Sequence, residues 1–136
     1  MVGRVGLDNM ANKPEVEAMQ FVRKWAKSKG IDPIDVSHSG RGYDYQFKHE
    51  DGKIEKVEVK GVSKSYGIPD MRVNEFRNKR LKADYLFVVG NVATHRKRRV
   101  YKIPRNAIKP KNLILLQTYR ITRFQGKKNM EKYRVR

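Results

Sequence analysis

The chain has no cysteine, few acidic residues in its second half and no long apolar run. The absence of cysteine excludes disulfides and cysteine-ligated zinc, and it fits an intracellular protein, cytoplasmic or nucleoid-associated. No apolar stretch approaches the length that crosses a bilayer, and the N-terminus lacks the pattern of a secretory signal. A length of 136 residues predicts one domain over 1–136 with a hydrophobic core of its own.

The positive charge lies almost entirely in the second half of the chain. Residues 1–60 hold 11 Lys or Arg against 10 Asp or Glu, whereas residues 61–136 hold 21 against 4. The net charge of +18 predicts a polyanionic partner, because a domain this basic repels itself. We expect DNA and no membrane partner, although a basic surface alone also suits an anionic membrane surface or a ribosome-associated protein.

A charged strand stands out in the first half. From Val57 to Gly61 the residues alternate, so that valines point one way while Glu58 and Lys60 point the other. A preceding strand that begins at Asp44 is expected to pair with it across a Glu-Asp-Gly-Lys turn, which brings Asp44 near Glu58. Two carboxylates and a lysine on adjoining strands predict a site for a hard divalent cation, Mg²⁺ or Mn²⁺.

These residues carry a family resemblance. Asp44 followed by Glu58-Val59-Lys60 resembles the signature of the PD-(D/E)XK nuclease superfamily, and Glu17 resembles the acidic helix residue ahead of its core strands. Gly-Tyr-Asp, then Glu-Val-Lys-Gly and a later Asn-Glu-Phe, is similar to the restriction-endonuclease-like (Mrr-like) branch and especially to the C-terminal domain type of the plant NO VEIN protein.

The resemblance covers roughly residues 14 to 90, and Tyr43 stands where the proline of the signature would be. It implies an α/β fold with a restriction-endonuclease-like core, in which a mixed β-sheet of about five strands is flanked by helices. It also implies a Mg²⁺-dependent endonuclease that hydrolyses DNA phosphodiester bonds, and a homodimer by family habit.

The resemblance further assigns roles to the site residues. Asp44 and Glu58 would bind the metal directly, and Glu17 would complete the metal shell or hold a metal-bound water. Lys60 would either deprotonate the attacking water or stay charged and stabilise the developing negative charge, and the sequence leaves both roles open. Glu75 would contact the site residues without binding the metal itself. The catalytic set is therefore Glu17, Asp44, Glu58 and Lys60.

The remaining segments are predicted from local patterns. We expect an irregular lead-in over 1–11, a helix from an Asn12 N-cap to Gly30, a second helix over 74–82 and a basic tail over 125–136. The apolar run 84–90 predicts a central strand parallel to its neighbour. Further expectations are a basic hairpin tip at 95–99, a strand at 100–103, a helical turn at 104–108 and a strand at 113–122.

Several basic residues are candidates for phosphate contact. They lie beside Asp44, after the charged strand or in the basic hairpin tip, and they are Arg41, Lys64, Arg96, Lys97, Arg98 and Arg99.

Other interpretations remain open. One is a structure-selective endonuclease resembling the archaeal Holliday-junction resolvases, and another is a non-catalytic nucleic-acid-binding module on a nuclease-like scaffold. The plainest is that Glu58 and Lys60 form a solvated ion pair on a strand, with Asp44 a turn residue.

Overall fold

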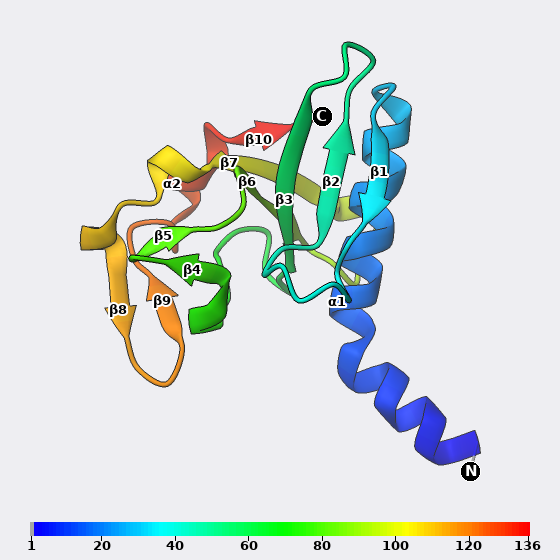
Figure 1. Cartoon of the computed structure of the whole chain (residues 1–136). Coiled ribbons are helices and arrows are strands. Elements are labelled where there is room, and N and C mark those ends of the chain that lie inside the picture. Colours follow the sequence, from blue (N-terminus) through cyan, green and yellow to red (C-terminus); the bar gives the residue numbers. More distant parts are fainter. Residues whose placement is uncertain (1) are drawn as a thin grey trace.

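A mixed six-stranded sheet forms the centre of the molecule, with strands in the order β1-β2-β3-β6-β7-β10. The computed structural model describes residues 2–136 and, within helix α1, the side chains from Pro14 onward. The predicted α/β fold with a restriction-endonuclease-like core is confirmed (Figure 1). The sheet strands are β1 (Asp32–Asp35), β2 (Tyr45–Lys48), β3 (Ile54–Gly61), β6 (Tyr85–Gly90), β7 (Arg99–Pro104) and β10 (Arg134–Val135).

The pairing of the central strands follows the predicted pattern. β2 and β3 form an antiparallel hairpin in which Tyr45 pairs with Val57. β3 and β6 are parallel, with Glu58 beside Leu86, and β6 returns through the basic loop into antiparallel β7. The apolar run of β6 is buried along its length after Tyr85, as a strand covered on both faces requires.

Helix α1 (Val2–Ser28) covers one face of this sheet. Ala18, Val22 and Ala26 are fully buried against the face that carries Val57 and Val59. This packing explains the helical spacing of small and apolar residues in the sequence, because one stripe of the helix must meet a flat apolar surface.

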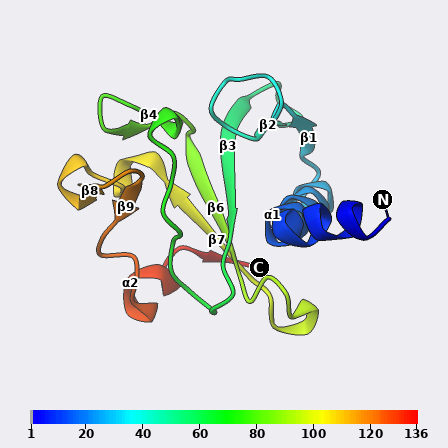
Figure 2. The ribbon, with the colours of Figure 1, turned by 90° about the horizontal axis from the view of Figure 1, so that it is seen from below.

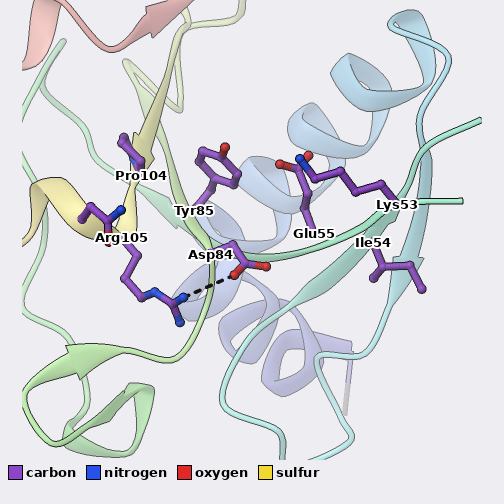
Figure 3. A pocket seen from close by; sticks show the side chains of 8 residues that line it. Lys53, Ile54, Glu55, Asp84, Tyr85, Pro104 and Arg105 are labelled. Atoms are coloured by element: carbon purple, nitrogen blue, oxygen red, sulfur yellow. Dashed lines mark ion pairs between the residues drawn. The ribbon is translucent and has the colours of Figure 1, made fainter. Parts of the chain in front are cut away.

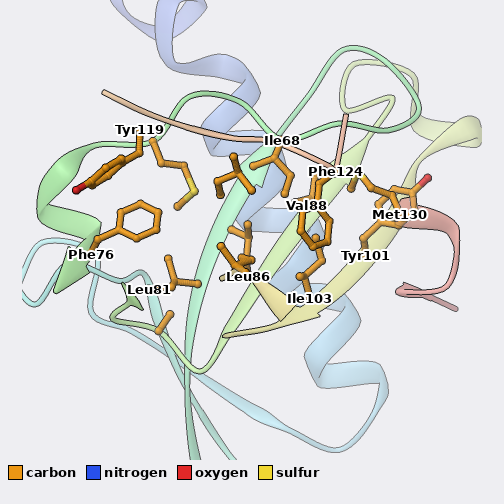
Figure 4. Packing of buried hydrophobic residues seen from close by; sticks show 14 of the residues in the cluster. Ile68, Phe76, Leu81, Leu86, Val88, Tyr101, Ile103, Tyr119, Phe124 and Met130 are labelled. Carbon is orange, nitrogen blue, oxygen red and sulfur yellow. The ribbon is translucent and has the colours of Figure 1, made fainter. Parts of the chain in front are cut away.

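The opposite face of the sheet carries a second core. Leu86 and Val88 of β6 pack with Tyr101 and Ile103 of β7 beneath the irregular segments that follow β3 and β7 (Figure 4). These segments include two small hairpins, β4 (Phe76–Arg77) with β5 (Arg80–Leu81), and β8 (Leu113–Leu115) with β9 (Tyr119–Ile121). Seen from below, α1 lies on one side of the sheet and both hairpins lie on the other (Figure 2).

The N-terminal expectations are wrong. α1 begins at Val2, not at Asn12, so the predicted irregular lead-in is helical from residue 2 onward, while residue 1 lies outside the described residues. Pro14 lies inside the helix. The φ of proline suits a helix and its missing N–H removes a single intrahelical bond, so a helix anchored by its packed C-terminal turns can extend past it.

The predicted helix over 74–82 is also wrong. A 3₁₀ turn (Val73–Glu75) leads into the β4–β5 hairpin. Asn78 and Lys79 have φ of 52° and 61°, which is the backbone that a tight hairpin turn needs and a right-handed helix excludes. The hairpin instead turns Phe76 and Leu81 into the second core.

The C-terminal expectations need two corrections. The predicted strand at 113–122 is the β8–β9 hairpin. The predicted basic tail, residues 125–136, is part of the fold, since it forms α2 (Lys127–Glu131) and then β10, which pairs with β7. Fully buried Phe124 and Met130 hold this segment in the second core, so its apolar anchors outweigh its polar composition.

Three further 3₁₀ turns lie in the described part of the chain: His95–Lys97, Arg105–Ala107 and Pro110–Asn112. The turn at Arg105–Ala107 matches the helical turn predicted there. In the part of the chain that the structure describes, no helix is both long and apolar enough to cross a membrane.

Candidate functional site

The β2–β3 register places two carboxylates side by side. Because Tyr45 pairs with Val57, Asp44 lies opposite Glu58, one step further along the antiparallel pair. Val57 and Val59 face α1, so Glu58 and Lys60 face the other side of the sheet, next to Leu86 and Val88 of β6. The predicted juxtaposition of Asp44 and Glu58 is therefore present.

The Asp44 carboxylate is held by backbone groups of the neighbouring strand. Its Oδ2 accepts a hydrogen bond of 2.8 Å from the Val59 N–H, and its own N–H donates to the Val57 carbonyl. Gly42, two residues earlier, has φ of +86°, and a Cβ there would lie 2.9 Å from the Asn74 carbonyl oxygen. Glycine therefore lets the loop approach closely at the point where it delivers Asp44.

Glu58 is a buried carboxyl with unusual electrostatics. Only 3% of its surface is exposed. Burial, and then the negative charges of Asp44 and Glu75, raise its pKa from a usual value of 4.5 to about 10, and Lys60 offsets this in part. Near neutral pH, Glu58 therefore holds a proton and donates a hydrogen bond to Asp44.

Lys60 is ion-paired with Glu75 and lies beside Glu58. Its Nζ lies 2.9 Å from the Glu75 carboxylate and 3.7 Å from that of Glu58. Burial lowers the pKa of Lys60, but the carboxylates of Glu75 and Glu58 outweigh burial and leave the pKa raised. Of the two roles left open by the sequence, this environment suits a lysine that stays charged.

Glu75 joins the site from the turn before β4. Its Oε2 accepts from the Arg72 N–H at 3.1 Å while Oε1 accepts from Lys60. The predicted supporting position of Glu75 thus corresponds to a direct contact with Lys60. This contact arises from the 3₁₀ turn and hairpin that replace the predicted helix.

Glu17 has different neighbours from those expected. Its carboxylate accepts a 2.9 Å hydrogen bond from Arg98 of the β6–β7 loop. Among the described α1 residues that line the hollow beside Asp44 and Glu58, the acidic one is Glu15, two positions earlier. The structure therefore brings together Asp44, Glu58 and Lys60, and it places Glu17 in an ion pair that fastens the β6–β7 loop to the helix.

A hollow of about 670 Å³ opens at these side chains. It is bounded by α1, by the loop between β1 and β2, by the end of β3 and by the turn at Arg72 and Glu75. Its lining includes the carboxyl groups of Glu15, Asp35, Asp44, Glu58 and Glu75 together with exposed Arg72. A polar opening of this size can admit a phosphate group and its adjoining sugar.

The donor atoms fit a hard cation with a limited protein contribution. Among the side chains that the structure describes, no three His, Asp or Glu residues converge on a point that could hold a metal ion. Mg²⁺ is nevertheless commonly held by one or two carboxylates together with waters and substrate oxygens. Asp44 and Glu58 supply such a pair. Burial, and then the negative charges of Asp44 and Glu75, raise the pKa of Glu58, and a bound cation would offset the repulsion between these charges.

The cationic residues predicted to contact phosphate fall into two groups. Four of them are exposed: Arg41, Lys64, Arg96 and Lys97. Lys64 and the Arg96 loop lie together beyond the parallel ends of β3 and β6, where the Lys64 carbonyl accepts a hydrogen bond from the Asn91 N–H. These two loops therefore flank the end of the sheet that carries Glu58 and Lys60.

The other two predicted contacts are engaged within the protein. Arg98 is largely buried, donates to the Val92 carbonyl and lies over the Phe21 ring in addition to pairing with Glu17. Arg99 is half-buried and lies 3.8 Å from Glu131. Arg98 and Arg99 are thus placed to hold the fold together, and phosphate contact by them stays a prediction.

A second group of cations was not predicted from the sequence. Arg77, Lys79 and Arg80 are exposed at the tip of the β4–β5 hairpin, which follows Glu75 directly. The signal in the sequence was Asn78 between basic residues, since asparagine tolerates positive φ and marks a turn. The helix predicted over 74–82 would instead have distributed these cations around its surface.

A second hollow lies at the opposite end of the sheet (Figure 3). It measures about 340 Å³, and its charges are largely paired, as in the contact of Arg105 with Asp84 at 3.8 Å. Burial, together with the Glu55 carboxylate, raises the pKa of Tyr85 there. His49 also pairs with Glu55, so the charged groups at this hollow largely contact one another.

Comparison with known protein families gives a match that covers the site. Residues 14–103 match the family described as Protein NO VEIN, C-terminal, a family linked to nuclease-like domains. No curated protein and no solved structure gives a significant match. The matched span runs from the packed part of α1 through β7 and contains Asp44, Glu58, Lys60 and Glu75, and the chain belongs to the NO VEIN C-terminal domain family.

Proposed function

We propose that this protein is a Mg²⁺- or Mn²⁺-dependent endonuclease that hydrolyses phosphodiester bonds of DNA. The observation that carries the proposal is the convergence of Asp44, Glu58 and Lys60 at the end of β3, beside exposed cations on the neighbouring loops. Carboxylates would repel phosphate in a protein that merely bound DNA, so their burial among cations is better explained by a bridging metal ion.

Each residue would have a distinct role in catalysis or binding. Asp44 and Glu58 would hold the cation, which when bound supplies Lewis-acid stabilisation and an activated water. Lys60, kept charged by Glu75, would stabilise negative charge on the phosphoryl oxygens. Arg41, Lys64, Arg96 and Lys97 would bind the flanking phosphates and orient the strand across the hollow.

A cleavage assay tests this function. Linear duplex, single strand, flap, four-way junction and RNA would be incubated with Mg²⁺ or Mn²⁺ and with wild type, D44N, E58Q or K60A. K56A is the matched control, because Lys56 is an exposed lysine of the same strand. Binding would be measured in parallel by gel shift in EDTA.

We expect each of the three site variants to lose at least about a hundredfold in cleavage, as removal of one catalytic group typically does, while K56A cleaves like wild type. Cleavage that persists in E58Q and K60A would contradict the assignment. Light scattering of the same preparations would test the homodimer that the family resemblance implies.

The second candidate is a non-catalytic nucleic-acid-binding module. It is favoured by one observation, the Lys60 ammonium lying between Glu58 and Glu75. In that case the Lys60–Glu75 ion pair and the proton on Glu58 offset the buried negative charge, and no metal is needed. Binding that ignores Mg²⁺, with no cleavage of any substrate, would select this candidate.

A further inference from the structure

The tip of the β8–β9 hairpin exposes a run of apolar side chains. Ile114, Leu115 and Leu116 are 48%, 61% and 55% exposed, in a chain whose other large apolar residues are mostly buried. Three consecutive exposed apolar residues are costly in water and commonly mark a contact surface. The run lies outside the residues that match the family, so it is a feature of this chain's own C-terminal part.

The hairpin is fixed to the candidate site. Tyr119 of β9 exchanges two backbone hydrogen bonds of 2.8 Å with Met71, the residue before Arg72 at the rim of the hollow. The Tyr119 ring also packs edge-on against Phe76, the residue after Glu75, with centroids 4.9 Å apart (Figure 4). The exposed tip is therefore held at a set position relative to Lys60 and Glu75.

The positive charge around the hairpin favours a negatively charged partner. Exposed cations precede and follow it in sequence, namely Lys109, Lys111 and Arg123, and a further exposed cation, Arg120 of β9, is paired with Asp70. A second copy of the chain would bring the same positive half to the contact, which disfavours self-association through this surface. A suitable partner offers negative charge to the cations and an apolar surface to the leucines. DNA offers both, because its stacked bases lie between the negatively charged phosphate backbones.

We propose that Leu115 and Leu116 act as a wedge that enters the base stack next to the candidate active site, which makes unstacked or branched DNA the preferred substrate class. Leu and Ile side chains inserted between base steps unstack and kink the duplex. The unstacking cost is smallest where pairing is already interrupted, so a wedge favours junctions, flaps and mismatches. The inference rests on the DNA-binding part of the proposed function and is independent of cleavage.

The test uses DNA that carries the fluorescent base 2-aminopurine, whose emission rises when it unstacks, in a duplex and at the branch point of a four-way junction. Binding and fluorescence would be measured in EDTA for wild type, L115S/L116S and L115F/L116F. I54S is the control, because Ile54 is 50% exposed at the other end of the sheet. Thermal melting would verify that each variant is folded.

We expect wild type, L115F/L116F and I54S to raise the fluorescence several-fold and to bind the junction more tightly than the duplex. L115S/L116S should lose the fluorescence rise and the junction preference, while the salt dependence of its binding stays unchanged because the cations remain. Binding without unstacking by wild type, or full unstacking by L115S/L116S, would overturn the wedge.

Two other results would also overturn it. One is a dimer that L115S/L116S dissociates in light scattering without a change in DNA unstacking. The other is tip-dependent binding to anionic phosphatidylserine vesicles with no effect of the tip on DNA. Unstacking without cleavage would leave the wedge standing and contradict the nuclease proposal, whereas a wild type that binds no DNA would contradict both.

Discussion

The Lys60 ammonium lies 2.9 Å from the Glu75 carboxylate, although the two residues are 15 positions apart and on different elements. This pair joins the central sheet to the turn that leads into the β4–β5 hairpin. It also fixes Lys60 beside Glu58 and determines how the site responds to mutation, pH and cations.

Removal of the Glu75 charge should destabilise the protein. E75Q removes the charged partner of the buried Lys60 ammonium, because Glu58, 3.7 Å away, holds a proton near neutral pH. We expect a loss of about 1–3 kcal/mol in the free energy of unfolding, measured by urea denaturation. D70N is the control, because it breaks the exposed Asp70–Arg120 pair and should leave stability nearly unchanged. Equal effects of E75Q and D70N would contradict a special role for the buried pair.

Stability should fall as pH rises through the neutral range. The pKa of Glu58 is raised from 4.5 in the unfolded chain to about 10 in the fold, so the unfolded chain releases this proton first. The stability from protonated Glu58 is therefore full below pH 4.5 and is lost progressively as pH rises towards 10. We expect a decline on the order of a few kcal/mol between these limits, measured by urea denaturation without divalent cations.

E58Q should remove most of this decline, because the amide keeps the hydrogen bond to Asp44 and cannot ionise. At the alkaline end of the range E58Q should be more stable than wild type. Parallel pH profiles for the two proteins would show that Glu58 is not the group responsible.

Addition of Mg²⁺ should stabilise the fold and release a proton. Glu58 must ionise to bind the cation, so proton release should appear as a dependence of the binding heat on the ionisation enthalpy of the buffer. At a hundred times Kd the gain is about 2.7 kcal/mol. D44N should abolish both effects while D84N, at the other hollow, retains them; millimolar Mg²⁺ without effect on wild type would exclude the site.

Different residues of the β6–β7 loop should contribute to DNA binding and to stability. R96A/K97A removes two exposed cations and should lower the slope of log K against log salt by about one per cation, with an unchanged melting temperature. R98A should instead lower the melting temperature, because it removes the hydrogen bonds that Arg98 donates to the Glu17 carboxylate and the Val92 carbonyl. The two variants serve as controls for each other. A lower melting temperature in R96A/K97A, with a change in only the salt dependence in R98A, would refute these assignments.

Gly90 should tolerate no side chain. A Cβ there would lie 2.3 Å from the Ser65 carbonyl oxygen, a backbone atom of the loop after β3. We expect G90A to lose about 1–3 kcal/mol of unfolding free energy by overpacking. G126A is the control, since a Cβ at Gly126 would meet nothing within 4 Å. A G90A protein as stable as G126A would show that the loop yields without cost.

Local sequence pattern determined the central sheet and the heart of the site. The alternation from Val57 to Lys60 and the turn before it fix the hairpin register, and the register alone puts Asp44 opposite Glu58. The apolar run of β6 needs burial on both faces, so its place beside β3 follows from the crossover between them. The charge asymmetry is likewise a property of the sequence.

Tertiary structure decided the partners of the charged groups. Residues 74–82 have a helical pattern, but they form a hairpin that buries Phe76 and Leu81 in the second core. This hairpin brings Glu75 to Lys60. Glu17 meets Arg98, 81 positions away, because α1 packs where the β6–β7 loop emerges. Such contacts join distant segments through packing geometry, which local propensity and periodicity do not encode.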